Sequence, residues 1–259
     1  MIKRTLQILV LSALLIGSTV SAQSILLMNE ECGGSAQYGP VALSNLGLVF
    51  TEVNDWTAFE TTFGDGSAWD LVVIDSYGNN ITAAGETALV NYIGNGGSVL
   101  VAYWDLANVP SVATALETSV VSIYGAPETI NVWSPGAPLF NSPNPVSGPL
   151  APIADTCVDD GQRLEPVGSG MALAGYTAAP TANEAAIVEG NGGRTIVFGF
   201  IPGLYDTDIV PLYENAIQNL IGGGVPQSVP VPAMSVYGML ALGLVVLFIG
   251  GIAVRRTSV

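Results

Sequence analysis

Four acidic residues are the main candidates for chemistry in this sequence of 259 residues. Glu30 and Glu31 follow a first apolar run, Asp75 ends a second, and Asp105 follows a third. If these runs are parallel strands of one sheet, their carboxyl ends meet at the edge where open α/β sheets bind ligands. Carboxylates crowded there favour a weak site for Ca²⁺ or Mg²⁺, because both ions prefer oxygen ligands. The alternative is a solvated acidic rim that holds no ligand.

The sequence contains no histidine. This excludes Ser-His-Asp and Cys-His catalysis, and zinc sites built on histidine. Paired carboxylates hydrolyse glycosidic bonds without histidine. Two functions therefore stay open: a non-enzymatic binding or structural module, and a carboxylate- or metal-dependent hydrolase that acts on extracellular glycans or peptides. The pattern favours the first, and we expect no catalytic residue and no cofactor beyond a weakly bound cation.

Charge is distributed unevenly along the chain. Six residues are Lys or Arg and 21 are Asp or Glu, so the formal net charge is −15. The acidic residues all lie between Glu30 and Glu214, whereas four of the six basic residues lie near the two ends. Such an acidic surface repels nucleic acid and attracts cations. We therefore expect no nucleic-acid partner.

Two cysteines, Cys32 and Cys157, are expected to form a disulfide if the chain is exported to an oxidising compartment. Two free thiols are the alternative. A second acidic group, at Asp155, Asp159 and Asp160 with Glu165, lacks the Asp/Asn alternation of a calcium-binding EF-hand loop and is expected to be solvated. Trp133 lies in a segment without helical or strand periodicity and is the best candidate for an exposed ring that stacks on a sugar.

Apolar runs and turn residues predict a doubly wound, mostly parallel α/β sheet of the flavodoxin-like type, within a domain of residues 23–222. Residues 118–183 are expected to form a β/loop-rich insertion that covers one edge of the sheet. A β-hairpin is expected at residues 184–200, and a last helix is expected from Asp208. The other expected elements are strands at 24–28, 49–53, 69–75 and 98–104, and helices at 38–46 and 82–93.

The two ends of the chain read as export and membrane segments. Residues 1–22 have the basic start, apolar centre and small-residue end of a signal peptide, so signal peptidase is expected to cut between Ala22 and Gln23. Residues 223–233 form a linker. Residues 234–254 carry no charge and are long enough, as a helix, to cross a membrane core of about 30 Å. Arg255 and Arg256, in the tail of residues 255–259, are expected to stay in the cytoplasm, which places the domain outside.

The start of this membrane tail resembles a known sorting signal. Residues 231–238 read Val-Pro-Ala-Met-Ser-Val-Tyr-Gly and are similar to the Ile-Pro-Thr-Leu-Ser-Glu-Trp-Gly start of IPTL-type C-terminal signals, relatives of the PEP-type tails that exosortases process in Gram-negative bacteria. The resemblance implies an exosortase-type sorting enzyme and the inner membrane as partners, and display in the cell envelope. Identical matches are Pro232, Ser235 and Gly238, and conservative ones are Val231, Met234 and Tyr237.

The domain itself resembles class I glutamine-amidotransferase-like domains, which have a flavodoxin-like fold. The resemblance is carried by the order of Ile-Leu-Leu-Met-Asn, Trp-Asp-Leu-Val-Val-Ile-Asp, Gly-Gly-Ser-Val-Leu-Val-Ala and Gly-Arg-Thr-Ile-Val-Phe-Gly-Phe. The family's catalytic residues do not carry over. Residues 102–106, where the family has its nucleophile, contain neither Cys nor Ser, and Ile201 and Gly203 stand where the family has His and Glu. The resemblance therefore implies the fold without glutaminase chemistry.

Overall fold

A computed structural model describes residues 23–30, 37–78, 81–124, 126–153, 161–206 and 209–222. Its strands are β1 Ile25–Glu30, β2 Thr51–Val53, β3 Leu71–Ser76, β4 Val99–Tyr103, β5 Thr118–Tyr124, β6 Asn131–Val132, β7 Gly161–Pro166, β8 Met171–Gly175, β9 Ala185–Gly190 and β10 Thr195–Phe198. In the described residues these strands form one sheet, in the order β2-β1-β3-β4-β10-β9-β7-β5. β8 pairs with β9 beside this path, and β6 pairs with β8.

The half of the sheet from β2 to β10 is parallel throughout. Its order, with β10 in fifth place, is the flavodoxin-like order, in which ligands bind at the carboxyl ends of the strands around β1 and β3. The remaining pairings are antiparallel, beginning with the expected hairpin of β9 and β10. The predicted α/β sheet with a parallel centre is confirmed.

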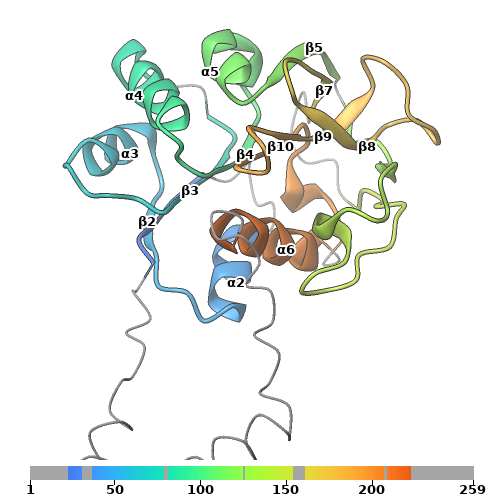
Figure 1. Cartoon of the computed structure of the whole chain (residues 1–259), viewed down its shortest axis with the longest axis horizontal. Helices are drawn as coiled ribbons and strands as arrows, with labels where there is room; N and C mark the ends of the chain where they lie inside the picture. Colours follow the sequence, from blue (N-terminus) through green and yellow to red (C-terminus); the bar gives the residue numbers. More distant parts are fainter. Residues whose placement is uncertain are drawn as a thin grey trace, which may run out of the picture.

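Helices cover both faces of the parallel half (Figure 1). On one face lie α2 (Tyr38–Asn45) and α6 (Ile209–Gly222), packed with Leu27 and Val73 of the sheet. On the other face lie α3 (Trp56–Phe63), α4 (Ala83–Gly94) and α5 (Pro110–Ala115), packed with Leu26 and Ile74. Successive strand side chains alternate between faces, so each apolar run contributes to both cores. Three short 3₁₀ turns complete the described elements: η1 Leu106–Asn108, η2 Pro138–Phe140 and η3 Pro202–Leu204.

The segment expected to be an insertion contains strands of the sheet itself. β5 pairs with β7, β7 pairs with β9 at Leu164, and β8 pairs with β9, all antiparallel. The segment therefore enlarges the sheet, in addition to lying against it. The bridge between Gly161 and Phe200 places the start of β7 against the chain that leaves β10.

The first strand begins and the last helix ends at the amino edge of the sheet. Ser24 accepts a 2.8 Å hydrogen bond from the backbone nitrogen of Asp70, which precedes β3. Ser98, which precedes β4, has its Oγ atom 3.3 Å from the carbonyl oxygen of Leu220 near the end of α6. Among the described residues no helix is long and apolar enough to cross a membrane, and the expected membrane span at 234–254 lies outside them.

Candidate functional site at the carboxyl edge of the sheet

Glu30, the last residue of β1, braces the loop that follows β3. One carboxylate oxygen accepts hydrogen bonds from the Ser76 hydroxyl at 2.7 Å and from the Gly78 backbone nitrogen at 3.0 Å. The Trp56 indole donates to the Gly78 carbonyl at 3.0 Å. A Cβ atom on Gly78 would lie 2.4 Å from the Glu30 carboxylate, so the contact requires glycine there. The Glu30 carboxylate thus makes structural hydrogen bonds on the face covered by α3 to α5.

Asp75 points to the opposite face of the sheet. Its Oδ2 atom accepts a 2.8 Å hydrogen bond from the phenol of Tyr213 on α6. Burial raises the pKa of Tyr213 well above its ordinary value, and the Asp75 charge raises it further. The phenol therefore stays protonated and remains a donor at neutral pH.

Asp105 is almost completely buried, at 4% exposure. Its side chain accepts a hydrogen bond from the Asn108 amide, and its carbonyl accepts one from the Asn108 backbone nitrogen at 2.9 Å. Burial raises the pKa of Tyr103, and the charges of Asp105, Glu30 and Glu86 raise it further. Asp105 and Glu30 therefore share the neighbourhood of Tyr103, apart from Asp75.

The carboxylates expected to converge are thus divided between the two faces of the sheet. Adjacent strand residues alternate in direction, so Asp75 faces α6 while its neighbour Ser76 faces Glu30. Within the described part of the chain, no three His, Cys, Asp or Glu side chains are grouped so that they could hold a metal ion. The geometry gives no support to the cation hypothesis, and Glu31 lies outside the described residues.

A side chain from β7 binds the backbone directly after β4, the stretch in which the resemblance would place the nucleophile. The Gln162 amide nitrogen donates to the carbonyls of Tyr103, at 3.0 Å, and Trp104. Gln162 is 2% exposed, and its amide oxygen has no hydrogen-bond partner among the described residues. Among the described non-glycine residues, φ is positive at Glu117, Asn183 and Asn191. Asp105 is not one of them, so its backbone is not in the strained left-handed conformation. The end of β4 is thus fixed by hydrogen bonds to a glutamine.

The chain that leaves β10 is fixed in a similar way. The Gly199 carbonyl accepts hydrogen bonds from the Gln162 backbone nitrogen at 2.6 Å and from the Tyr176 phenol at 2.7 Å. Ile201, which precedes η3, and Gly203, which lies within it, are both buried. The resemblance places the family's His and Glu at these two positions. Neither Ile201 nor Gly203 carries a group that could transfer a proton.

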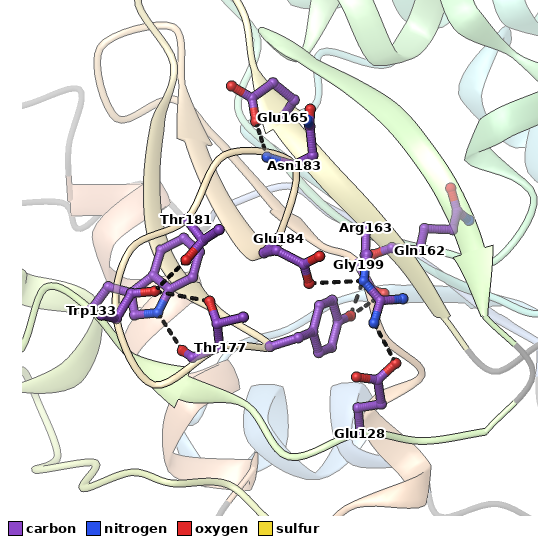
Figure 2. A network of polar contacts seen from close by, with 12 residues as sticks. Glu128, Trp133, Gln162, Arg163, Glu165, Thr177, Thr181, Asn183, Glu184 and Gly199 are labelled. Atoms are coloured by element: carbon purple, nitrogen blue, oxygen red, sulfur yellow. Dashed lines mark hydrogen bonds and ion pairs between the residues drawn. The ribbon is translucent and has the colours of Figure 1, made fainter.

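Arg163, next to Gln162 in β7, lies in an ion-pair network (Figure 2). Its Nη2 atom is 2.7 Å from Glu128, its Nε atom is 2.9 Å from Glu184, and the guanidinium lies 5.4 Å from the centre of the Tyr176 ring. The Tyr205 phenol donates to the Glu128 carbonyl at 2.6 Å. The arginine therefore joins the enlarged part of the sheet to the segment around residue 128.

Trp133 is not an isolated exposed ring. Its indole donates to the Thr177 carbonyl at 2.8 Å (Figure 2), and its ring lies so close to Gly175 that an added Cβ atom would be 2.0 Å from it. The partly buried ring packs against the core on the α3 to α5 side.

Several predicted residues lie outside the described part of the chain. These are Ala22, Glu31, Cys32, Asp155, Cys157, Asp159, Asp160, Val231, Pro232, Met234, Ser235, Tyr237, Gly238, Arg255 and Arg256. Gln23 is the first described residue. The signal cleavage, the disulfide and the sorting motif therefore stay predictions.

The structure also shows site residues that sequence reasoning missed. Gln162 and Tyr176 carry no local signal, because their partners lie on distant strands. Tyr77 and Trp104 form an aromatic pair with ring centres 5.1 Å apart. Each directly follows a strand end, and that position could have identified them.

Comparisons with known proteins bear on the fold alone. No family model matches the chain, and no curated protein matches it. The mmIFT52 N-terminal domain is 14% identical with a TM-score of 0.50, over 78% of this chain and 99% of that domain. A glutamine amidotransferase from Thermotoga maritima is 10% identical with a TM-score of 0.44, over 86% and 95%. A glutamine amidotransferase from Methylobacillus flagellatus is 9% identical with a TM-score of 0.43, over 77% and 92%.

Proposed function

We propose that this chain is an exported binding or structural module without enzymatic activity, held outside the cytoplasm by a C-terminal membrane tail. One observation carries the proposal. Gln162 binds the backbone after β4, where an amidotransferase-like domain would present its nucleophile. Glu30, Asp75 and Asp105 each accept structural hydrogen bonds instead of meeting in one pocket.

The location follows from the two ends of the sequence. A signal peptide at residues 1–22, a membrane-length apolar run at 234–254 and the pair Arg255-Arg256 support export with the domain outside. The similarity of residues 231–238 to IPTL-type signals supports sorting by an exosortase-type enzyme. Signal peptidase and that sorting enzyme are the proposed processing partners, at the inner membrane of a Gram-negative cell envelope.

A hydrolysis assay on the full-length protein tests the absence of enzymatic activity. The protein is incubated with glutamine, peptide and glycan substrates, with EDTA, Ca²⁺ or Mg²⁺, beside the variants Asp105→Asn and Glu30→Gln. We expect no turnover that depends on the protein. Turnover abolished by Asp105→Asn or Glu30→Gln in a folded variant would establish the hydrolase instead.

Membrane fractionation tests the location. The full chain is expected in the membrane fraction with a mature N-terminus at Gln23, and a chain lacking residues 234–256 is expected in the soluble exported fraction. The matched control replaces Pro232, Ser235 and Gly238 with alanine, which keeps the apolar span but removes the identical motif positions. Persistent membrane association of the deleted chain would contradict the anchor, and unchanged processing of the alanine variant would contradict the sorting motif.

A further inference from the structure

The connection between α2 and β2 is an exposed apolar segment. Residues 46–50, here called the apolar loop, read Leu-Gly-Leu-Val-Phe and carry no charge. Leu46, Leu48 and Phe50 are half-buried and pack against the core on the α2 and α6 side. Val49 is 78% exposed. The core thus holds three side chains of the loop in place, and Val49 extends into solvent beside them.

Local hydrogen bonds fix the course of the apolar loop. The backbone nitrogen of Gly47 donates to the Ser44 carbonyl, and that of Leu48 donates to the Leu43 carbonyl, both at 3.0 Å. Gly47 has a φ of +68°, the left-handed conformation in which a glycine ends many helices. The end of α2 therefore determines where Val49 is presented.

The apolar loop lies at the amino edge of the sheet, the edge at which α6 ends (Figure 1). Thr51, which directly follows the loop, is paired in register with Leu26 near the start of β1. The hydroxyl of Ser98, which precedes β4, donates to the Leu220 carbonyl near the end of α6. The exposed valine and the end of the last described helix therefore share one edge of the domain.

The length of chain beyond α6 is short enough to keep this edge near a membrane. Helix α6 ends at Gly222, and residues 223–233 connect it to the apolar run at 234–254. A flexible linker of this length has a root-mean-square span of about 17–20 Å. That span is less than the width of a domain of this size. A domain anchored through such a linker stays close to the lipid surface.

Charged residues near the apolar loop indicate which lipid it would contact. Glu52 in β2 and Asp70 before β3 are both exposed, and Asp70 accepts a 2.8 Å hydrogen bond from the Ser24 backbone nitrogen. Arg194 is also near the amino edge, but its side chain lies 3.5 Å from the Ile93 carbonyl of α4, which covers the other face of the sheet. Carboxylates beside the loop repel anionic headgroups, so a zwitterionic lipid surface fits better.

We propose that the apolar loop docks on the surface of a zwitterionic lipid bilayer, with Val49 inserted at the boundary of headgroups and acyl chains. Apolar side chains bind this boundary in proportion to the apolar area that they bury. One short loop binds weakly by itself, but a membrane tail on the same chain makes docking an intramolecular step at a high effective concentration. The inference rests on the proposed membrane tail and adds a second membrane contact, made by the domain itself.

A tryptophan reporter tests the contact. Full-length Val49→Trp is reconstituted into phosphatidylcholine vesicles with brominated acyl chains, which quench a tryptophan that touches them. Val121→Trp is the matched control, because Val121 is an exposed valine of β5, at the opposite end of the strand order from β2. After the wild-type fluorescence is subtracted, we expect the added ring to be quenched in Val49→Trp and unquenched in Val121→Trp. Adding an anionic lipid at low salt is expected to reduce the quenching of Val49→Trp.

Amide hydrogen exchange gives a second readout that needs no added ring. The full-length protein is placed in nanodiscs of phosphatidylcholine. Exchange of residues 48–50 is expected to be slower in the wild type than in Val49→Asp by at least about tenfold, because the variant loses a buried valine and adds a charge. Val121→Asp is expected to leave exchange at these residues unchanged. The thermal midpoint of each variant confirms that it folds.

Other outcomes overturn the docking proposal. Equal quenching of the two reporters would indicate contact that does not depend on the apolar loop. Blue-shifted but unquenched fluorescence of Val49→Trp would indicate that protein covers the loop, either residues 223–233 or a second copy of the chain. Equal exchange in the wild type and Val49→Asp would show that Val49 does not hold the loop at the membrane.

Cosedimentation with the vesicles distinguishes this proposal from the proposed anchor. A chain that does not stay with the vesicles would contradict the membrane tail, and docking would be rejected with it. A chain that stays with the vesicles while Val49→Trp remains unquenched would contradict docking alone.

Discussion

Tyr213 on α6 and Asp75 at the end of β3 are joined by a hydrogen bond of 2.8 Å that spans 138 residues of sequence. Tyr213 is completely buried, whereas the Asp75 side chain is partly exposed. The bond fixes the last helix to the carboxyl end of a central strand. It also fixes the direction of Asp75 relative to the aromatic pair.

Replacing Tyr213 by phenylalanine is expected to destabilise the fold by about 1–3 kcal/mol, because it removes a hydrogen bond to a carboxylate without leaving a large cavity. The measurement is chemical unfolding of Tyr213→Phe, Asp75→Ala and the double variant, because alanine leaves no acceptor for the Tyr213 phenol. A coupling energy near zero in this double-mutant cycle would contradict a direct interaction.

A negatively charged side chain in place of Gln162 is expected to destabilise the fold. In Gln162→Glu, a carboxylate would face the carbonyls of Tyr103 and Trp104, so we expect a loss of more than about 2 kcal/mol at pH 7. Burial beside acceptors raises the pKa of the new glutamate in the folded state. The penalty is therefore full above that folded pKa, and it disappears as the pH falls below the unfolded value of about 4.3.

The control for this charge effect is Gln162→Met, which keeps a similar volume and has no titratable group. Its loss of stability is expected to be independent of pH. Thermal midpoints measured between pH 4 and pH 8 test both variants. Parallel pH curves for Gln162→Glu and Gln162→Met would contradict the position of the Gln162 amide.

Glu117 is expected to make stability depend on pH. Its carboxylate accepts hydrogen bonds from the Asn191 backbone nitrogen and the Ser169 hydroxyl, and these bonds lower the pKa of Glu117 below its ordinary 4.5. The stabilisation is present above the unfolded pKa and is lost as the pH falls through the lower folded pKa. Glu117→Gln should therefore lower the thermal midpoint at pH 7 and lower it less in acid.

Glu189 offers a control of opposite sign. Burial raises the pKa of Glu189 in β9, so its charge opposes folding above the folded pKa, and the opposition ends below the unfolded pKa. Glu189→Gln should stabilise the protein at pH 7 and have no effect in acid. Thermal unfolding of Glu117→Gln and Glu189→Gln is measured between pH 4 and pH 8. If the midpoints of both variants depended on pH in the same way, both pKa assignments would be contradicted.

The cysteines give a test outside the described residues. If Cys32 and Cys157 form a disulfide, neither is labelled by a thiol reagent in the denatured, unreduced chain, and both are labelled after reduction. Removing the bond through Cys32→Ser with Cys157→Ser should cost about 2–5 kcal/mol in unfolding experiments. Labelling of both residues before reduction would show that the thiols are free.

The parallel frame could be predicted from the sequence because its strands are continuous apolar runs. The runs that became β1, β3 and β4 are buried on both faces, and turn residues bound them. The last helix could be predicted too, since Ile209, Tyr213 and Leu220 follow helical spacing, and all three are buried. These signals are local, so they could be read without knowledge of distant contacts.

The face of the sheet toward which each carboxylate points could not be predicted from local signals. A strand that is apolar on both faces gives no pattern that distinguishes one face from the other. Asp75 and Ser76 are adjacent, and a shift of one residue would exchange their places. The expectation that Glu30 and Asp75 converge depended on the face of the sheet that each side chain occupies, which the sequence does not show.

Two short helices were also missed. α3 contains three threonines, although Asp55 caps it by accepting from Ala58 at 2.7 Å and Trp56, Phe59 and Phe63 are spaced as on one helical face. α5 is six residues long, too short for a clear period. Gln162 is a further case, because its role depends on carbonyls 58 and 59 residues away.

The contacts of Ser24 and Ser98 place the start of β1 and the end of α6 at the amino edge of the sheet. The helix α6 ends at that edge, whereas Tyr77 and Trp104 lie beyond the opposite ends of their strands. A strand of five or six residues separates these two edges by about 17–20 Å. In a domain held by the proposed tail, the point of attachment and the aromatic pair would therefore lie at opposite edges of the sheet.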